Sequence, residues 1–407
     1  MMAMSDPRRP RFIACISRCE EIPDYTSRDP DAEFVFASYS DLGAKAIQID
    51  PDRMGEAAAR FARLHAERPF TAILNRKEKC VVPAAYLASV LGLPPILVAP
   101  DLARDKYEMR RALNGTASFP GTVLIRDAGD LSHVSDAMFP AVLKPRFGFN
   151  SRSAVRVSDR SELASAYADQ YAQYSLLPKQ DGTNSDFVVE EFIAGTEHNV
   201  ESLLKDGRVL FHLISDKMGM QPPFFIEMGD NMPSTLPPAA QQACMDAAGK
   251  AIDTLGIRNG WTHTEVKRHG DQVLVVESAA RMGGGYFEEL IETVFGIDRM
   301  GMLIGMYRGN APSQAPASRV HAAARRVVVY GAERMRILRN PEILTRDSHI
   351  KLVWPRRVDQ INRIMTGPPF DFNNTLFEFM AVGTSAREAE ARADGVLEEA
   401  ILSECGP

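Results

Sequence analysis

Two glutamates on neighbouring strands of a predicted hairpin could bind a cation together. The segment GWTHTEVKRHGDQVLVVESAARMGGGYF, residues 260–287, is typical of two strands with alternating apolar side chains. If HGD forms the loop, Glu265 pairs with Val275 and Glu277 pairs with His263. The two carboxylates then share one face of the hairpin as diagonal neighbours, about 7–8 Å apart. Hard oxygen ligands suit Mg²⁺, which also accepts water and phosphate oxygens, so we predict a magnesium site; a solvated face is the alternative.

Residues that favour anion binding follow the second glutamate. Arg281 leaves the strand, and Gly283, Gly284 and Gly285 precede a helix predicted to begin at Tyr286. Free amides at a helix N-terminus bind anions, and glycine lets a ligand approach the backbone closely. We therefore expect a metal site, an arginine and an anion site to converge at the end of this hairpin.

An upstream lysine precedes a second segment suited to phosphate. Lys144 ends an apolar strand and is followed by a flexible loop that contains Gly148, Ser151 and Ser153. An ammonium beside free amides and hydroxyls could hold phosphate, although an exposed lysine beside a hairpin turn is the alternative. Lys106 lies in the preceding predicted helix and by itself reads as a solvated lysine.

A third segment, FVVEEFIAGTEHNVE, places carboxylates after an apolar strand. Glu190 and Glu191 end the strand, and Glu197 follows Gly195. This pattern suits a nucleotide base at a strand edge with a carboxylate on the ribose hydroxyls, unless the glutamates are only solvated. His263 shares the hairpin face with the metal-site glutamates; of a general base and a packed strand residue, we favour the packed residue.

The elements around these residues indicate an α/β and α+β protein. Apolar strands alternate with helices at the N-terminus, which favours a parallel sheet. The first strand lacks a following G-x-G-x-x-G and the chain has no P-loop motif, so a dinucleotide fold and a P-loop fold are disfavoured. The expected elements are a strand at 11–17, a helix at 52–69, a strand at 70–75, a helix at 78–92, a strand at 95–98, a helix at 101–115 that starts at Asp101, and a helix at 239–255.

Composition sets the class of protein. A chain of 407 residues with a net charge of -6 is not expected to bind nucleic acid. The sequence contains no run of about 18 apolar residues, so we expect no membrane span. Five scattered cysteines argue against a disulfide framework and for a reducing compartment, so we expect a cytoplasmic protein. The sequence does not indicate the oligomeric state, for which a homodimer is only the commonest assembly among soluble proteins.

The order of these segments resembles the ATP-grasp superfamily. The matching strings are RDKYEMR, PAVLKPRFGFNSRSAV, VVEEFIAGTEHNVE, HTEVK and ESAARMGGG, which together cover about residues 100–310. The resemblance implies an ATP-grasp fold, with an N-terminal α/β domain at 1–100, an ATP-grasp domain of two clamping subdomains at 101–310, and a small C-terminal α/β domain at 311–407.

The resemblance also implies a role for each candidate residue. It assigns ATP phosphates to Lys106, Lys144 and the loop residues Ser151 and Ser153, adenine to Glu190 and the main chain at Ile193, ribose to Glu197, Mg²⁺ to Glu265 and Glu277, and the transferring phosphoryl group to Arg281. Two Mg²⁺ ions are expected, with Mn²⁺ as a substitute.

One departure from the family pattern points to a subgroup. Many ATP-grasp enzymes have asparagine two residues after the second glutamate, where this chain has Ala279. The string ESAAR, and a loop PPFF-E at 222–227, resemble the L-amino acid ligases, the dipeptide synthetases of the bacilysin type. By that resemblance Glu227 faces the amino group of a first amino acid.

The implied reaction joins a carboxylate to an amine at the expense of ATP. Phosphorylation of the carboxylate gives an acyl phosphate, which an amine attacks to release ADP and phosphate. Loops 147–153 and 218–237 are the candidate lids against water. Two alternatives stay open: the same scaffold acting on an acid without an amino group, which a positive charge facing Glu227 would favour, or a nucleotide-binding module without catalysis, which only Ala279 supports.

Overall fold

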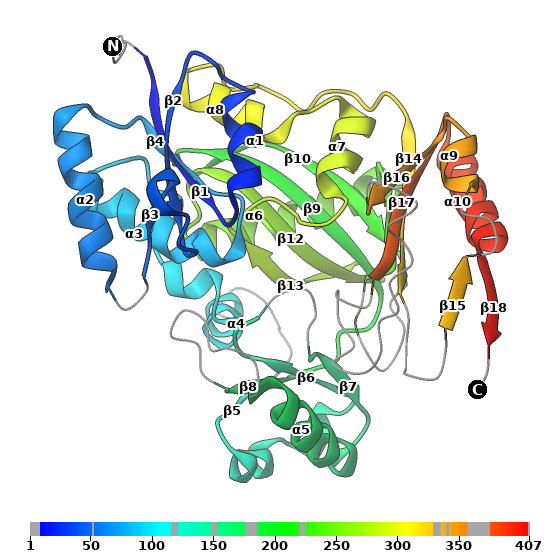
Figure 1. The fold of residues 1–407 in the computed structure, drawn as a ribbon. Coiled ribbons are helices and arrows are strands. Elements are labelled where there is room, and N and C mark those ends of the chain that lie inside the picture. The colour runs from blue at the N-terminus through cyan, green and yellow to red at the C-terminus, as the bar shows by residue number, and fades with distance from the viewer. Residues whose placement is uncertain are drawn as a thin grey trace.

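The computed structural model describes most of the chain and arranges it around three main sheets (Figure 1). The described residues are 9–50, 53–114, 121–148, 153–175, 185–219, 225, 227–328, 335–338, 342–355 and 375–405. In these parts of the chain, no helix has the length and apolar character needed to cross a membrane.

The N-terminal sheet is parallel, as predicted. Its strands are β1 (Arg11–Ile16), β2 (Glu33–Ser38), β3 (Ile47–Gln48) and β4 (Ala72–Leu74), in the order β3-β2-β1-β4. The accompanying helices are α1 (Ile22–Thr26), α2 (Met54–Glu67) and α3 (Val81–Leu91). The helices predicted at 52–69 and 78–92 are therefore present, and β2 and β3 were not predicted.

The strand predicted at 95–98 is wrong. Only Leu97 makes an isolated antiparallel bridge, to Ile257. The Val98 amide donates to Gly256 O, and the Arg258 amide donates to Ile96 O. The segment thus runs along a loop of the large sheet rather than beside β4, so its apolar side chains connect two parts of the molecule.

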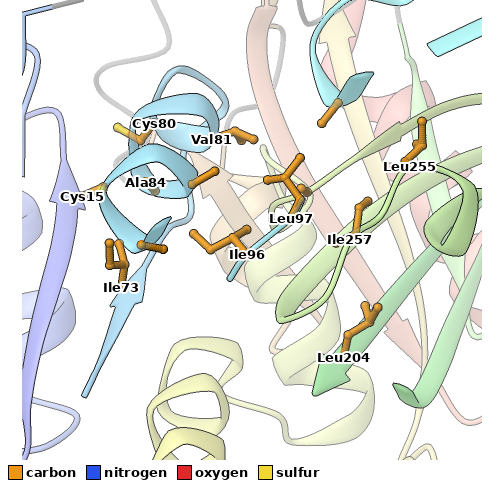
Figure 2. Packing of buried hydrophobic residues seen from close by; sticks show 14 of the residues in the cluster. Cys15, Ile73, Cys80, Val81, Ala84, Ile96, Leu97, Leu204, Leu255 and Ile257 are labelled. Carbon is orange, nitrogen blue, oxygen red and sulfur yellow. The ribbon is translucent and has the colours of Figure 1, made fainter. Parts of the chain in front are cut away.

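Figure 2 shows how this connection is packed. Ile73 of β4 and Ala84 of α3 lie on one side of Ile96 and Leu97, and Leu204 and Ile257 lie on the other. These side chains belong to one buried hydrophobic cluster, in which each is 8% exposed or less. Because the cluster is continuous, the N-terminal sheet is held against the large sheet by apolar burial, which fixes the wall of the site described below.

A small antiparallel sheet lies at the opposite end of the molecule (Figure 1). Its strands are β5 (Thr122–Ile125), β6 (Ala141–Pro145), β7 (Val155–Val157) and β8 (Phe187–Glu191), in the order β5-β8-β6-β7, and α5 (Arg160–Ser175) packs on it. The helix before it, α4 (Lys106–Asn114), begins later than predicted. Asp105 Oδ1 accepts from the amides of Tyr107 and Glu108, so Asp105 and not Asp101 caps this helix.

The large sheet has eight antiparallel strands. They are β9 (Thr196–Lys205), β10 (Arg208–Lys217), β11 (Gly229–Met232), β12 (Gly260–His269), β13 (Gln272–Ala279), β14 (His321–Val328), β16 (Ile350–Trp354) and β17 (Thr375–Gly383), in the order β13-β12-β9-β10-β11-β14-β17-β16. Strand β14 continues the sheet beyond residue 310, so the proposed domain limits stay a prediction.

Helices cover both faces of the large sheet. Leu203 and Leu204, adjacent in β9, point to opposite faces. Leu204 packs in the cluster that contains α6 (Pro238–Thr254), and Leu203 packs in the cluster that contains α7 (Phe287–Phe295) and α8 (Arg299–Tyr307). The remaining elements are α9 (Ile343–Arg346), α10 (Ala386–Ala400) and the paired strands β15 (Met335–Leu338) and β18 (Ile401–Cys405).

Candidate functional site

A pocket of about 530 Å³ collects most of the predicted site residues. All three main sheets contribute to its lining. The predicted residues that line it are Lys106, Lys144, Glu190, Ile193, Glu197, Glu227, Glu265, Glu277 and Arg281. Ser153 is buried just outside the lining, beside Ala154, and Ser151 lies outside the described residues.

The two metal-site glutamates are closer than the predicted register allows. His269 pairs with Gln272 across a two-residue turn, and Gly270 takes a φ of 59° in that turn. A bulge then shifts the pairing so that Glu265 lies directly opposite Glu277. The predicted diagonal relation was wrong because the loop is one residue shorter than HGD and the bulge adds a residue on β13.

Each of the two facing carboxylates forms an ion pair with a lysine that also lines the pocket. Lys217 Nζ lies 3.2 Å from Glu265 Oε2, and Lys106 Nζ lies 3.1 Å from Glu277 Oε1. Burial opposes ionisation of Glu265, but the charges of Lys217 and His263 hold its pKa well below the usual range. Burial likewise opposes the charged form of Lys106, and the Glu277 charge outweighs it and raises the Lys106 pKa.

This arrangement fits a hard divalent cation. Like charges directly opposite each other in a sheet repel, and the pair is accommodated here because cations sit on both carboxylates. Both donors are oxygens, as Mg²⁺ prefers. The described residues contain no group of three or more His, Cys, Asp or Glu that could hold a metal alone, so further ligands would come from water and a bound phosphate.

On the small sheet, one carboxylate is enclosed by two cations. Glu190 Oε2 accepts from Lys144 Nζ at 2.8 Å and from Arg110 Nη2 at 3.3 Å. Burial would raise the pKa of Glu190, but the charges of Arg110 and Lys144 lower it to about 2. Glu190 Oε1 is buried and has no hydrogen-bond partner among the described residues, so it can accept a donor from a ligand.

The segment that links β8 to β9 has groups suited to a base, and the start of β9 has a carboxylate suited to a ribose. Ile193 O accepts from Lys267 Nζ at 3.0 Å, and that ammonium lies 4.5 Å from the centroid of the Phe192 ring. The rings of Phe192 and Phe225 stack at 6.3 Å. Glu197 Oε1 accepts from Lys217 Nζ at 2.6 Å. Sequence reasoning missed both lysines, although Lys217 ends a strand and Lys267 belongs to the HTEVK string.

Arg281 is held at the boundary with the N-terminal sheet. Its Nε donates to Glu78 Oε2, and its Nη1 donates to Met282 O at 2.8 Å. Burial opposes its charge, but Glu78 outweighs this and raises the Arg281 pKa. Glu78 precedes α3 and was not predicted, because nothing in its local sequence links it to a residue 203 positions away.

His263 belongs to a buried ionic cluster. Its Nδ1 bonds with Glu201, which also accepts from Arg299 Nη1 at 3.1 Å, and its ring packs edge-on against Phe287 at 5.2 Å. Burial would lower the pKa of His263, but Glu201 raises it to about 9. The packed residue that we favoured is thus also a cation at neutral pH, which disfavours a general base.

Gly283 connects this cluster to the glycine run. Its amide donates to Glu201 Oε2 at 3.2 Å, and its carbonyl accepts from Arg299 Nη2 at 3.0 Å. A Cβ on Gly283 would lie 2.5 Å from Glu201 Oε1, so a side chain there would displace Glu201. The following helix, α7, begins at Phe287 rather than Tyr286 and has no side-chain cap. Gly284 and Gly285 also line the pocket.

Glu227 lies against a cation that the sequence did not predict. Arg326 Nη1 donates to Glu227 O at 2.9 Å and lies 3.5 Å from Glu227 Oε2. Arg326 Nε in turn donates to Glu378 Oε1 at 2.7 Å. Burial opposes ionisation of Glu227, but Lys217 outweighs it and lowers the Glu227 pKa, whereas burial beside Glu227 raises the pKa of Asp230 well above its usual range.

Comparison with known proteins identifies the type of domain. Residues 137–289 match the model of the ATP-grasp domain. Carnosine synthase 1 of Gallus gallus is 29% identical over 302 residues, which cover 70% of this chain and 32% of that protein. Alanine–anticapsin ligase of Bacillus subtilis is 29% identical over 251 residues, which cover 57% of this chain and 53% of that enzyme.

The fold agrees with a solved structure along nearly its whole length. The crystal structure of L-amino acid ligase from Bacillus licheniformis matches with a TM-score of 0.76 over 98% of this chain and 100% of that one, at 22% identity. The chain spans only about a third to a half of the length of the two relatives matched by sequence. Residues 137–289 therefore form an ATP-grasp domain, and the chain resembles L-amino acid ligases in sequence and has the fold of the Bacillus licheniformis enzyme.

Proposed function

We propose that the protein is an ADP-forming ligase that joins a carboxylate, most simply that of an L-amino acid, to the amine of a second substrate through an acyl phosphate. The observation that carries the proposal is the facing pair of Glu265 and Glu277, with Lys106 and Arg281 on the same pocket. The amino-acid ligases among its relatives, as their names describe them, support the same reaction class.

In phosphoryl transfer, each of the pocket residues would have a role of its own. Ile193 O and Glu197 would hold base and ribose, and Lys144 and Lys106 would neutralise the phosphates. Mg²⁺, held by Glu265 and Glu277, would supply further charge neutralisation when bound. Arg281, kept in place by Glu78, would stabilise charge on the transferring phosphoryl group. Transfer requires each lysine to exchange its carboxylate partner for ATP, which the open pocket allows.

No protein nucleophile is needed in this scheme. The substrate carboxylate attacks the terminal phosphorus of ATP, and the acyl phosphate carries phosphate as a leaving group. The amine nitrogen then forms the amide bond as the carbon–oxygen bond to phosphate breaks. Protonated His263, fixed by Glu201 and next to Glu265, is suited to donating a hydrogen bond to developing negative charge.

A second candidate is the same chemistry on an acid without an amino group. The guanidinium of Arg326 against Glu227 favours it, because a carboxylate already paired with arginine attracts an ammonium less strongly. Glu378 also pairs with Arg326, however, which leaves two carboxylates for one guanidinium and keeps an amino-acid substrate the first choice.

The test is ATP turnover with Mg²⁺ against single and paired L-amino acids, with matched acids that lack the amino group, such as propionate in place of alanine. ADP and AMP are measured separately, and products are weighed by mass spectrometry. ADP release that needs an amino-acid pair, with a product one water lighter than the pair, supports the dipeptide ligase. Turnover with propionate supports the second candidate, and AMP release contradicts both.

A further inference from the structure

One lysine bridges two of the carboxylates to which the proposed function gives different ligands. Lys217 Nζ lies 2.6 Å from Glu197 Oε1, the carboxylate suited to ribose, and 3.2 Å from Glu265 Oε2, one of the two metal-site glutamates. The Lys217 side chain is 4% exposed and lines the pocket together with both glutamates. A single ammonium therefore connects a group suited to the nucleoside with a group suited to the metal.

The bridge follows from the order of three neighbouring strands. Strand β9 lies between β12 and β10, and it carries Glu197, whereas β12 carries Glu265 and β10 ends at Lys217. Glu265 pairs with Asn199, which shares a face of β9 with Glu197 because side chains two residues apart point to the same side. The backbones of β10 and β12 are about 10 Å apart, which is two strand spacings. The long lysine side chain crosses β9 over this distance, so the strand order creates the bridge.

The same ammonium opposes both ligands. A divalent cation on Glu265 would lie close to the positive charge of Lys217 and be repelled by it. Ribose hydroxyls on Glu197 would compete with that ammonium for the same carboxylate. Once one ligand has displaced Lys217, the second no longer has to do so, and it therefore binds more tightly than it would alone.

We propose that Lys217 is a positioning residue that couples nucleoside binding to metal binding, because its ammonium holds both Glu197 and Glu265 until either ligand displaces it. The proposal rests on the proposed function for the assignment of ribose to Glu197 and of the metal to Glu265, and it adds a means of regulation to that site. Coupling between two ligands is reciprocal, so the metal strengthens nucleoside binding by the same factor as the nucleoside strengthens metal binding.

The test measures Mn²⁺ binding with adenosine, a nucleoside that has no phosphate to contact the metal. Free Mn²⁺ is titrated by electron paramagnetic resonance, without adenosine and at saturating adenosine. For wild type, we expect adenosine to tighten Mn²⁺ binding about 10-fold. Lys217→Met keeps a long side chain without its charge. It should bind Mn²⁺ alone about 10- to 100-fold more tightly than wild type, the range of a hydrogen bond to a charged group, and adenosine should add nothing.

Two variants act as controls. Lys217→Arg keeps a cation and should preserve the coupling of wild type, which a merely structural role for Lys217 would not predict. Lys267→Met removes the other lysine beside Glu197, whose Nζ lies 3.7 Å from Oε2, and should leave the binding of Mn²⁺ alone unchanged. Because the effect of adenosine is measured first on wild type, the test does not depend on the folding of Lys217→Met.

Two results overturn the inference alone. One is equal Mn²⁺ affinity of wild type with and without adenosine, and the other is an adenosine effect of equal size in Lys217→Met. ADP formation is measured on the same preparations, so the proposed ligase survives either result if ADP is released. Failure of adenosine or of Mn²⁺ to bind overturns the ribose or the metal assignment, and the inference with it. Absence of ADP with every substrate pair overturns the proposed function.

Discussion

Two clusters of the pocket use the same residue types in opposite ways. In the first, Glu190 is enclosed between Lys144 and Arg110, and its side chain is 7% exposed. In the second, Glu265 and Glu277 face each other across β12 and β13 with a lysine on each, and their side chains are 25% and 26% exposed. Both clusters line the pocket, but the first, which we call the closed cluster, is almost fully buried, and the second, which we call the open cluster, is more exposed to the pocket.

This difference in exposure distinguishes a cluster that we expect to stabilise the fold from one that we expect to bind a ligand. A buried carboxylate between two cations cannot lose its charge without leaving both cations uncompensated, so its removal should weaken folding. Carboxylates that reach the pocket can exchange a lysine for a ligand cation at little cost to the fold, since partly exposed ion pairs contribute little. Charge pairing by itself is therefore a poor guide to a ligand site, and exposure to the pocket is a better one.

The largest expected effect comes from the open cluster. Glu277→Gln should lower ADP formation about 1000-fold, because the variant loses one of two anionic ligands for the cation that neutralises the phosphates. Its free energy of unfolding should change by less than about 1 kcal/mol. Initial rates at saturating Mg²⁺ and ATP, together with urea unfolding, measure the two quantities.

Glu292→Gln is the matched control for this substitution, because Glu292 is an exposed glutamate of α7. It should leave both rate and stability unchanged. Full activity in Glu277→Gln with unchanged unfolding would contradict the metal assignment. Loss of activity accompanied by a large loss of stability would instead mean that the open cluster behaves like the closed one.

The closed cluster should respond in the other way. Glu190→Gln should destabilise the protein by about 3 kcal/mol, because Arg110 and Lys144 then lack their shared anion. The pKa of Glu190 is lowered to about 2 from the ordinary 4.5. Its stabilisation is therefore present above pH 4.5 and is lost as the pH falls towards 2, so wild type and variant should converge in that window.

Urea unfolding of both proteins at several pH values between about 7 and 2 measures this convergence. A difference in unfolding free energy that stays constant down to pH 2 would mean that packing, and not charge, accounts for it. A difference near zero at pH 7 would remove the distinction between the closed and the open cluster.

A third test concerns the backbone at Gly283 and Gly284, which follow Arg281 in the chain. Gly283→Ala places a Cβ 2.5 Å from Glu201 Oε1 and 2.9 Å from His263 Nδ1, and should cost about 2 kcal/mol of stability through displaced side chains. Gly284→Ala meets nothing within 4 Å and should cost less than about 0.5 kcal/mol. Thermal unfolding of the pair measures the contrast, and equal losses would contradict the described Glu201–His263 contact.

Much of the fold and of the pocket lining could be predicted because the residues on which these predictions depend lie close together in the sequence. The parallel N-terminal sheet follows from apolar strands alternating with helices, and Glu265, Glu277 and Arg281 lie within one hairpin and its exit. The register was missed because a bulge leaves no mark in the sequence pattern. Glu201, Arg299 and Arg326 were missed because their partners are 52 or more positions away, and pairing over such distances is decided by how the sheets pack.

The smallest effect is expected where a buried carboxyl is already neutral. Asp230 accepts hydrogen bonds from Asn199, Ser215 and Tyr286, and its burial beside Glu227 raises its pKa well above the usual 3.8. Asp230→Asn should therefore change stability by less than about 1 kcal/mol near pH 4, in contrast to Glu190→Gln, since an amide replaces an uncharged acid. As the pH rises above 3.8, the unfolded wild type releases a proton that the folded state retains, so wild type should lose stability relative to the variant. Urea unfolding between pH 4 and 8 tests the direction of this change in stability. If the variant instead becomes less stable relative to wild type as the pH rises, Asp230 is ionised in the folded protein, as Glu190 is.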